Sequence, residues 1–178
     1  MLHPALRIVT RALAWSIEAR TGVAGAAVLA PLATLGAPPT DTLVVSLLGL
    51  EPEPETLSPS FNPRRSGEGF LRTEPPVAFS AVLLVAASHA NYADALAALD
   101  HAVSGLRQRP ALDVTEAPAL QQVAVETEAL SLADLDHLWA TVGAPHRPSV
   151  VVRVRITGSE PRLPDPTVPP IATVVEGP

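Results

Sequence analysis

Two segments of the sequence are apolar at nearly every position over the length of a β-strand. They are DTLVVSLLGLE (residues 41–51) and PPVAFSAVLLVAAS (residues 75–88). A strand with one solvent-exposed face alternates between apolar and polar residues, whereas a strand covered on both faces does not. We therefore expect both segments to lie inside one β-sheet that is covered on its two sides, which limits the fold to the α/β (α+β) classes.

Apolar residues that recur every three or four positions predict two longer helices. The first spans about residues 4–19, and its expected inner face consists of Leu2, Leu6, Val9, Leu13 and Ile17. The second begins at Asn91, a good N-cap residue, and stops before Pro110. Its expected inner face consists of Tyr92, Leu96, Leu99, Val103 and Leu106. The small apolar segment after the first helix is expected to be a loop or a further short helix.

Residues 130–156 combine a short helix, a sharp stop and a strand. Ser131 can cap the helix, with Asp134 in its first turn, and Gly143 is placed to end it. The apolar residues of this helix are Leu132, Leu135, Leu138 or Trp139, and Val142, and we expect Trp139 to be largely buried. The following strand turns Val150, Val152, Val154 and Ile156 to one side and Val151, Arg153 and Arg155 to the other.

These elements predict a single domain with a mixed β-sheet of about four to five strands, flanked by two long helices and one short helix. A half-buried strand in QQVAVETEAL (residues 121–130) is expected near a sheet edge. The domain covers residues 1–157, and residues 158–178 form an extended proline-rich C-terminal arm. Within the arm, IATVVE (residues 171–176) has strand character and is a candidate for addition to another chain's sheet. A disordered tail is the alternative.

Composition excludes several kinds of chemistry. The 178 residues contain no cysteine and no lysine, which rules out disulfides, thiol catalysis, cysteine-ligated metals and a Schiff-base lysine. The net charge of −6, without a basic stripe, argues against a nucleic-acid partner. The apolar runs are too short to span a bilayer, so no direct membrane insertion is expected.

Two groups of ionisable residues are candidate chemical sites. Asp134 and His137 share a helix face and could hold a metal, but no third ligand lies within sequence reach. The acids of residues 51–55 could do acid–base work in a pocket, but the prolines between them favour a solvated strip. No catalytic motif is present. We therefore expect no catalytic, cofactor-binding or metal-binding residues, no cofactor and no enzymatic activity.

The order of the parts resembles the cap, or tail-terminator, family of bacterial extracellular contractile injection systems, which is related in role to phage tail terminators. The resemblance rests on VVSLLGLEPEPETL, the NPRR loop, the Pro75–Pro76 pair before the second strand, NYADAL, LSLADLDHLW and PSVVVRVR, and covers about residues 5–157. It implies a structural protein that forms a hexameric ring, ends the inner tube and anchors the last sheath layer. Assembly would take place in the bacterial cytoplasm, into a particle that can be released.

The resemblance also directs attention to residues that could contact tube, sheath or neighbouring subunits. The paired arginines Arg64 and Arg65 could bind acids of a neighbour, or else a carboxylate or phosphate ligand. The expected interface residues are Arg64, Arg65, Arg153, Arg155, Ile171, Val174 and Val175. The alternative function is another adaptor or completion protein of a phage-tail-like particle.

Overall fold

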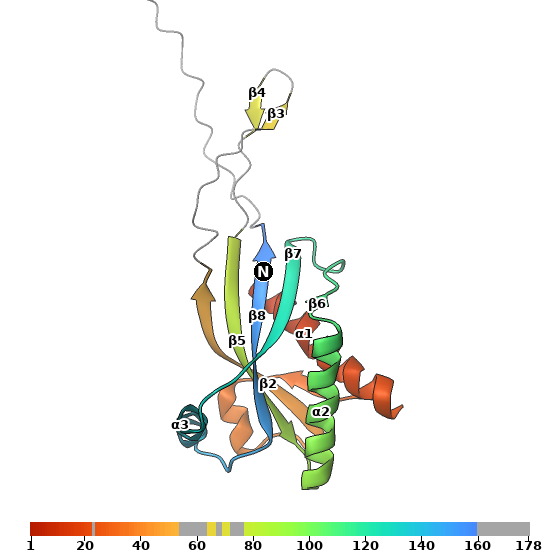
Figure 1. The fold of residues 1–178 in the computed structure, drawn as a ribbon, viewed down its shortest axis with the longest axis vertical. Helices are drawn as coiled ribbons and strands as arrows, with labels where there is room; N and C mark the ends of the chain where they lie inside the picture. Colours follow the sequence, from red (N-terminus) through yellow and green to blue (C-terminus); the bar gives the residue numbers. More distant parts are fainter. Residues whose placement is uncertain (23, 54–63, 67–68, 72–76, 160–178) are drawn as a thin grey trace, which may run out of the picture.

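The computed structural model describes residues 1–22, 24–53, 64–66, 69–71 and 77–159, with backbone only for 64–66 and 69–71. A six-stranded sheet in the order β1-β2-β5-β8-β7-β6 forms its centre (Figure 1). The strands of this sheet are β1 (Ala27–Leu29), β2 (Thr42–Pro52), β5 (Val77–Ser88), β6 (Ala111–Leu112), β7 (Leu120–Glu128) and β8 (Ser149–Gly158). The helices are α1 (Leu2–Thr21), α2 (Tyr92–Gln108), α3 (Leu132–Val142) and the 3-10 helix η1 (Leu32–Gly36).

The predicted fold class is confirmed, and the sheet has more strands than expected. The additional strands are β1 and β6, which are three and two residues long and too short to show a sequence period. β1 pairs in parallel with β2, while the other pairs are antiparallel, so the sheet is mixed. The segment that was expected to be a loop or a short helix therefore contains an edge strand, followed by η1.

The sheet separates two apolar cores, as the two uninterrupted apolar segments predict. Successive residues of β2 and β5 point to opposite faces, so both faces of these strands need cover. The larger core lies between the sheet and the α1–α2 layer and includes Leu43, Val45, Leu83 and Val85. The smaller core lies under η1 and α3 and includes Leu35, Val44, Leu84, Ala86, Trp139 and Val151.

The predicted inner face of α1 is confirmed at its centre, where Leu6, Val9 and Leu13 are buried. The predicted inner face of α2 is wrong in part. Its buried residues are Ala95, Ala98, Ala102, Gly105 and Leu106, whereas Tyr92 is 67% exposed and Leu96 44% exposed. Small side chains allow α2 to lie close to α1, and a periodicity argument that ranks leucine above alanine points to the neighbouring face.

The short helix, its sharp end and the following strand that were predicted for residues 130–156 are confirmed. The Ser131 hydroxyl accepts a hydrogen bond from the Asp134 backbone N–H at 3.1 Å and donates one to its carboxylate at 2.7 Å. Gly143 ends α3 with a φ of 67°, in the left-handed region that favours glycine. Trp139 is 4% exposed, as expected, but Leu132 is 86% exposed and does not belong to the inner face.

β3 (Arg64–Ser66) and β4 (Gly69–Leu71) form a separate two-stranded sheet. The predicted arm lies outside the described residues from position 160 onward. The division into a domain and an arm therefore stays a prediction.

Candidate interaction surfaces

The first candidate surface is a row of ion pairs on the sheet face that also carries α3. Arg153 of β8 places Nη1 2.5 Å from Glu51 Oε2 on the β2 side. Its Nη2 lies 2.9 Å from Glu128 Oε1 on β7. One guanidinium therefore connects acids from strands on both sides of β8. These donated hydrogen bonds, first to Glu128 and then to Glu51, raise the pKa of Arg153.

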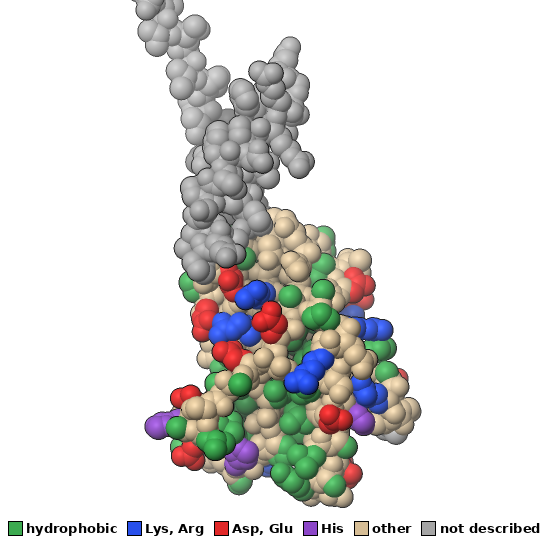
Figure 2. Space-filling view, viewed as in Figure 1, with side chains coloured by type: hydrophobic (Ala, Val, Ile, Leu, Met, Phe, Trp, Pro, Cys, Tyr) green, Lys and Arg blue, Asp and Glu red, His purple; other side chains and the backbone are tan. Residues whose placement is uncertain are grey.

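A second, looser set of ion pairs lies beside the first. Arg155 Nε is 3.7 Å from Glu53 Oε1, and Arg155 Nη1 is 4.0 Å from Glu126 Oε1. The Ser80 hydroxyl donates a hydrogen bond to Glu53. Figure 2 shows the acidic and basic side chains alternating on the upper part of the described surface. The carboxylates of Glu51, Glu53, Glu126 and Glu128 therefore surround the two guanidiniums.

This arrangement defines what is available to a partner. The Arg153 side chain is 26% exposed and held by two carboxylates, while the Arg155 side chain is 56% exposed and loosely held. The expected solvated strip of residues 51–55 begins with acids that pair within the chain, and Glu55 lies outside the described residues. The Glu51 and Glu126 side chains are 56% and 60% exposed, so a partner surface would meet them and Arg155 before it reached Arg153.

The structure describes the other expected interface residues only in part or not at all. Arg64 and Arg65 lie on β3, of which only the backbone is described. Ile171, Val174 and Val175 lie outside the described residues. The structure therefore does not bring the expected interface residues together, and their role stays a prediction.

The proposed acid–histidine pair of α3 has local partners. Asp134 is bonded to Ser131, and His137 Nδ1 lies 3.2 Å from the Ala133 carbonyl oxygen. Within the part of the chain that the structure describes, no three His, Cys, Asp or Glu side chains are grouped to hold a metal ion.

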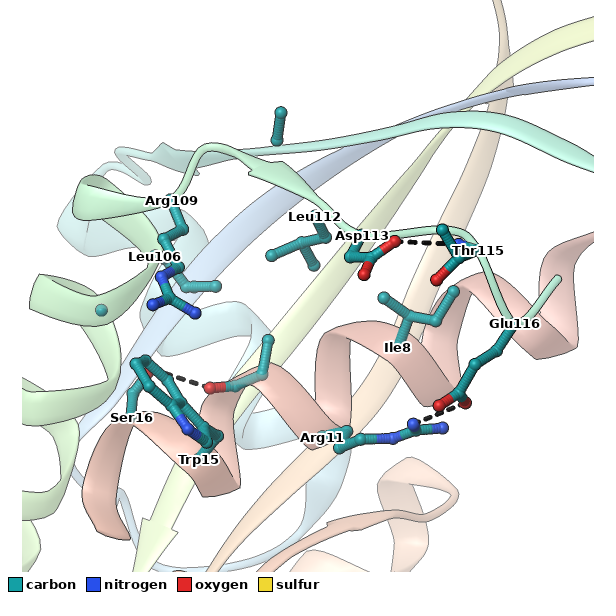
Figure 3. Close-up of a pocket in the computed structure, with 13 residues that line it drawn as sticks. Ile8, Arg11, Trp15, Ser16, Leu106, Arg109, Leu112, Asp113, Thr115 and Glu116 are labelled. Atoms are coloured by element: carbon teal, nitrogen blue, oxygen red, sulfur yellow. Dashed lines mark hydrogen bonds and ion pairs between the residues drawn. The ribbon is translucent and has the colours of Figure 1, made fainter. Parts of the chain in front are cut away.

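The second candidate surface is a groove between α1, α2 and β6 that was not predicted (Figure 3). Its volume is about 360 Å³, and Ile8, Leu106 and Leu112 are among its apolar lining residues. The Arg109 guanidinium lies over the Trp15 ring, 4.0 Å from its centroid, and Arg11 pairs with Glu116 at 2.6 Å. The sequence did not predict this contact, because Trp15 and Arg109 are far apart in the chain and no local pattern relates them.

The comparison with protein families decides the assignment. A family model described as the Pvc16 N-terminal domain matches residues 6–173, which is nearly the whole chain. The chain belongs to the Pvc16 N-terminal domain family. This agrees with the resemblance to cap and tail-terminator proteins seen in the sequence. The search of curated proteins found no match to this sequence.

Two solved structures show the same fold as this Pvc16 N-terminal domain protein. The PVC sheath/tube terminator of an extracellular contractile injection system, in its extended state, has a TM-score of 0.59 and 17% sequence identity. The anti-feeding prophage tube-terminating cap has a TM-score of 0.61 and 14% identity. The matches cover 96% and 95% of this chain, but only 63% and 60% of those chains. This protein therefore spans about three fifths of their length.

No helix among residues 1–22, 24–53 and 77–159 combines the length and the hydrophobicity needed to cross a bilayer.

Proposed function

We propose that this Pvc16 N-terminal domain protein is a structural cap of a contractile injection particle, and not an enzyme. In this role it forms a hexameric ring, ends the inner tube and anchors the last sheath layer. It is assembled in the bacterial cytoplasm into a particle that can be released from the cell. The ring and the anchoring work through contacts between copies and with tube and sheath proteins, without a cofactor.

The observation that carries this proposal is the combined match to one family and to two terminating proteins. Family membership extends over residues 6–173. The two similar structures, a sheath/tube terminator and a tube-terminating cap, cover at least 95% of this chain. Because their identities are 17% and 14%, the likeness supports the shared fold, and the shared role is our inference.

The described surface leaves apolar side chains in solvent on separate parts of the domain: Trp15, Leu47, Leu50, Tyr92, Leu96 and Leu132 are each at least 38% exposed. Single exposed apolar residues are normal on a folded domain, so they do not carry the proposal. The expected contact residues, Arg64, Arg65, Arg153, Arg155, Ile171, Val174 and Val175, belong to this proposal.

The proposal is tested with the purified chain and the tube and sheath proteins of its particle. Light scattering coupled to size exclusion is expected to give a mass of six copies. Electron microscopy of growing tubes is expected to show the protein at one end and tubes that stop lengthening.

Other results would redirect the assignment. A ring of different symmetry at the particle, without an effect on tube length, would favour another adaptor or completion protein. A monomer that binds neither tube nor sheath would refute the cap.

A further inference from the structure

The side of β2 that faces away from β5 is open along residues 47–52. β1 covers this side only from Leu43 to Val45, and Ala30 N–H donates the next hydrogen bond to the Val45 carbonyl. Among the described residues, no strand pairs with the outer side of β2 beyond that point. In Figure 1 the upper part of β2 accordingly forms the margin of the sheet.

The features of this margin that protect exposed strands lie at its two ends, where a bulge begins it and Glu51 and Pro52 end it. Leu47 and Leu50 are 38% and 51% exposed, and the nearest acid, Glu51, is held by Arg153. A bulge at Leu47/Gly49 interrupts the ladder to β5, but the ladder is regular again from Gly49 to Pro52. Free backbone N–H and C=O groups beside exposed apolar side chains are a template for another strand.

The opposite margin of the sheet differs. β6 covers β7 at Val123 and Ala124, and the residues beyond include Glu126 and Glu128. The exposed side chains of β7 are all polar, namely Gln121, Gln122, Glu126 and Thr127, so this margin lacks the exposed leucines of β2. The β2 margin is therefore the better acceptor of the two described edges.

The sequence contains a suitable donor. Residues 171–176, IATVVE, are mostly β-branched and apolar, contain no proline, and are bounded by Pro170 and Gly177. Their number matches residues 47–52 of the open margin. Twelve residues, 159–170, separate this segment from the end of β8 at Gly158. Twelve extended residues span at most about 40 Å.

The topology favours a donor from a different copy. The register places the end of β2, the start of β5 and the end of β8 at one end of the sheet, with Pro52 opposite Phe79 and Val77 opposite Gly158. The chain therefore leaves β2 and enters β5 at this same end. To reach the outer side of its own β2, the arm would have to cross the connection between these two strands, and connections at one end of a sheet rarely cross.

We propose that the β2 margin, residues 47–52, accepts residues 171–176 of another copy of this chain as an added strand. The interface is heterologous, because each copy offers a donor and an acceptor that differ. Repetition of such a contact produces a closed ring or an open filament. This inference rests on the proposed function, since it assigns one of the contacts that link copies in the ring.

Cross-linking tests the pairing directly, because the chain has no cysteine of its own. A Leu50→Cys chain is mixed with a differently tagged Val174→Cys chain under mild oxidation. Ile171→Cys and Val175→Cys chains replace Val174→Cys to sample the neighbouring registers. The matched control is Leu132→Cys, an exposed leucine on α3. We expect severalfold more mixed disulfide with Leu50→Cys than with Leu132→Cys in at least one register.

Equal yields in every register would overturn the inference. A chain that carries both cysteines and cross-links only within itself would show pairing in cis, which also overturns it. As a second measurement, Val174→Pro removes a backbone donor, with Thr167→Pro as the control outside the segment. Val174→Pro is expected to increase amide exchange at residues 47–51 in the assembled protein, whereas Thr167→Pro is not.

The two proposals can fail separately. If Val174→Pro still assembles, stops tube growth and leaves amide exchange unchanged, the pairing is wrong and the cap function stands. If the unaltered chain neither assembles nor stops tube growth, the cap function is wrong whatever the cross-links show.

Discussion

Gly105 of α2 and Ser16 of α1 touch with no room for a side chain at position 105. A Cβ atom at Gly105 would lie 2.0 Å from Ser16 Oγ and 2.4 Å from Ser16 Cβ. Ser16 is itself fixed, because its hydroxyl donates a 2.7 Å hydrogen bond to the Ala12 carbonyl. This contact sets how closely the two long helices pack.

Gly105→Ala is therefore expected to destabilise the protein. Glycine to alanine inside a helix normally stabilises by about 0.5–1 kcal/mol. Here overpacking reverses the sign, and we expect a loss of about 1–3 kcal/mol in the free energy of unfolding. Urea denaturation measures it, with Gly36→Ala as control because no atom lies within 4 Å of a Cβ there. Stabilisation by Gly105→Ala would show that the helices are farther apart than described.

The rotated face of α2 can be tested by a pair of substitutions. Ala102 is fully buried, so Ala102→Leu is expected to cost about 1–3 kcal/mol by overpacking. Leu96 is 44% exposed, so Leu96→Gln is expected to change stability by no more than about 0.5 kcal/mol. Thermal and urea unfolding of the two variants decide between the faces. If Leu96→Gln destabilised the protein more than Ala102→Leu, the face that carries Leu96 would be the inner one.

The two tryptophans are expected to report different environments. Trp139 is 4% exposed and tilted against His146, with ring centroids 5.3 Å apart, whereas Trp15 is 45% exposed. Trp139→Ala is expected to cost about 3–5 kcal/mol, because it leaves a large cavity beneath α3. Trp15→Ala should cost only about 0.5–1 kcal/mol, the contribution of its contact with Arg109.

Fluorescence checks this assignment in variants that keep the fold. Trp15→Phe should leave an emission at short wavelength from the buried Trp139, and Trp139→Phe an emission at longer wavelength. If Trp139→Phe changed neither the emission maximum nor the stability, the burial of Trp139 would be contradicted.

The ion pair between Arg153 and Glu128 is expected to contribute modestly. Both side chains are partly exposed, at 26% and 32%, so solvent screens the pair. A double-mutant cycle of Arg153→Gln and Glu128→Gln should give a coupling of about 0.2–1 kcal/mol. The coupling should shrink in 1 M salt, where the Debye length is about 3 Å. The control cycle, Arg155→Gln with Glu126→Gln, should give nearly none because the atoms are 4.0 Å apart and more exposed.

Titration of Arg153 changes the stability that this ion pair contributes in one predictable direction. Because the pKa of Arg153 is raised in the folded chain, its contribution to stability is fully present below the ordinary pKa of an arginine. That contribution is lost only as the pH rises through the higher folded value. Between about pH 6 and 9 the coupling should therefore be unaffected by titration of Arg153. A fall of the coupling within this range would contradict the assignment.

The sequence by itself determined the fold class, the buried strands, the capped α3 helix and the burial of Trp139. Each of these follows from a local rule: continuous apolar runs in residues 41–51 and 75–88, a Ser131 cap, and a Gly143 stop. Such rules need only the neighbouring residues, so they can be applied to one chain without coordinates.

Only the tertiary structure decided which face of α2 is buried, where the short strands β1 and β6 pair, and which acids hold Arg153. These features depend on residues far apart in the chain, such as Ser16 with Gly105 and Arg153 with Glu51. A helix with apolar residues on two faces packs by the face whose shape lets its neighbour approach. The side chains of the neighbouring helix determine which face is buried, and the spacing of apolar residues along one helix does not reveal it.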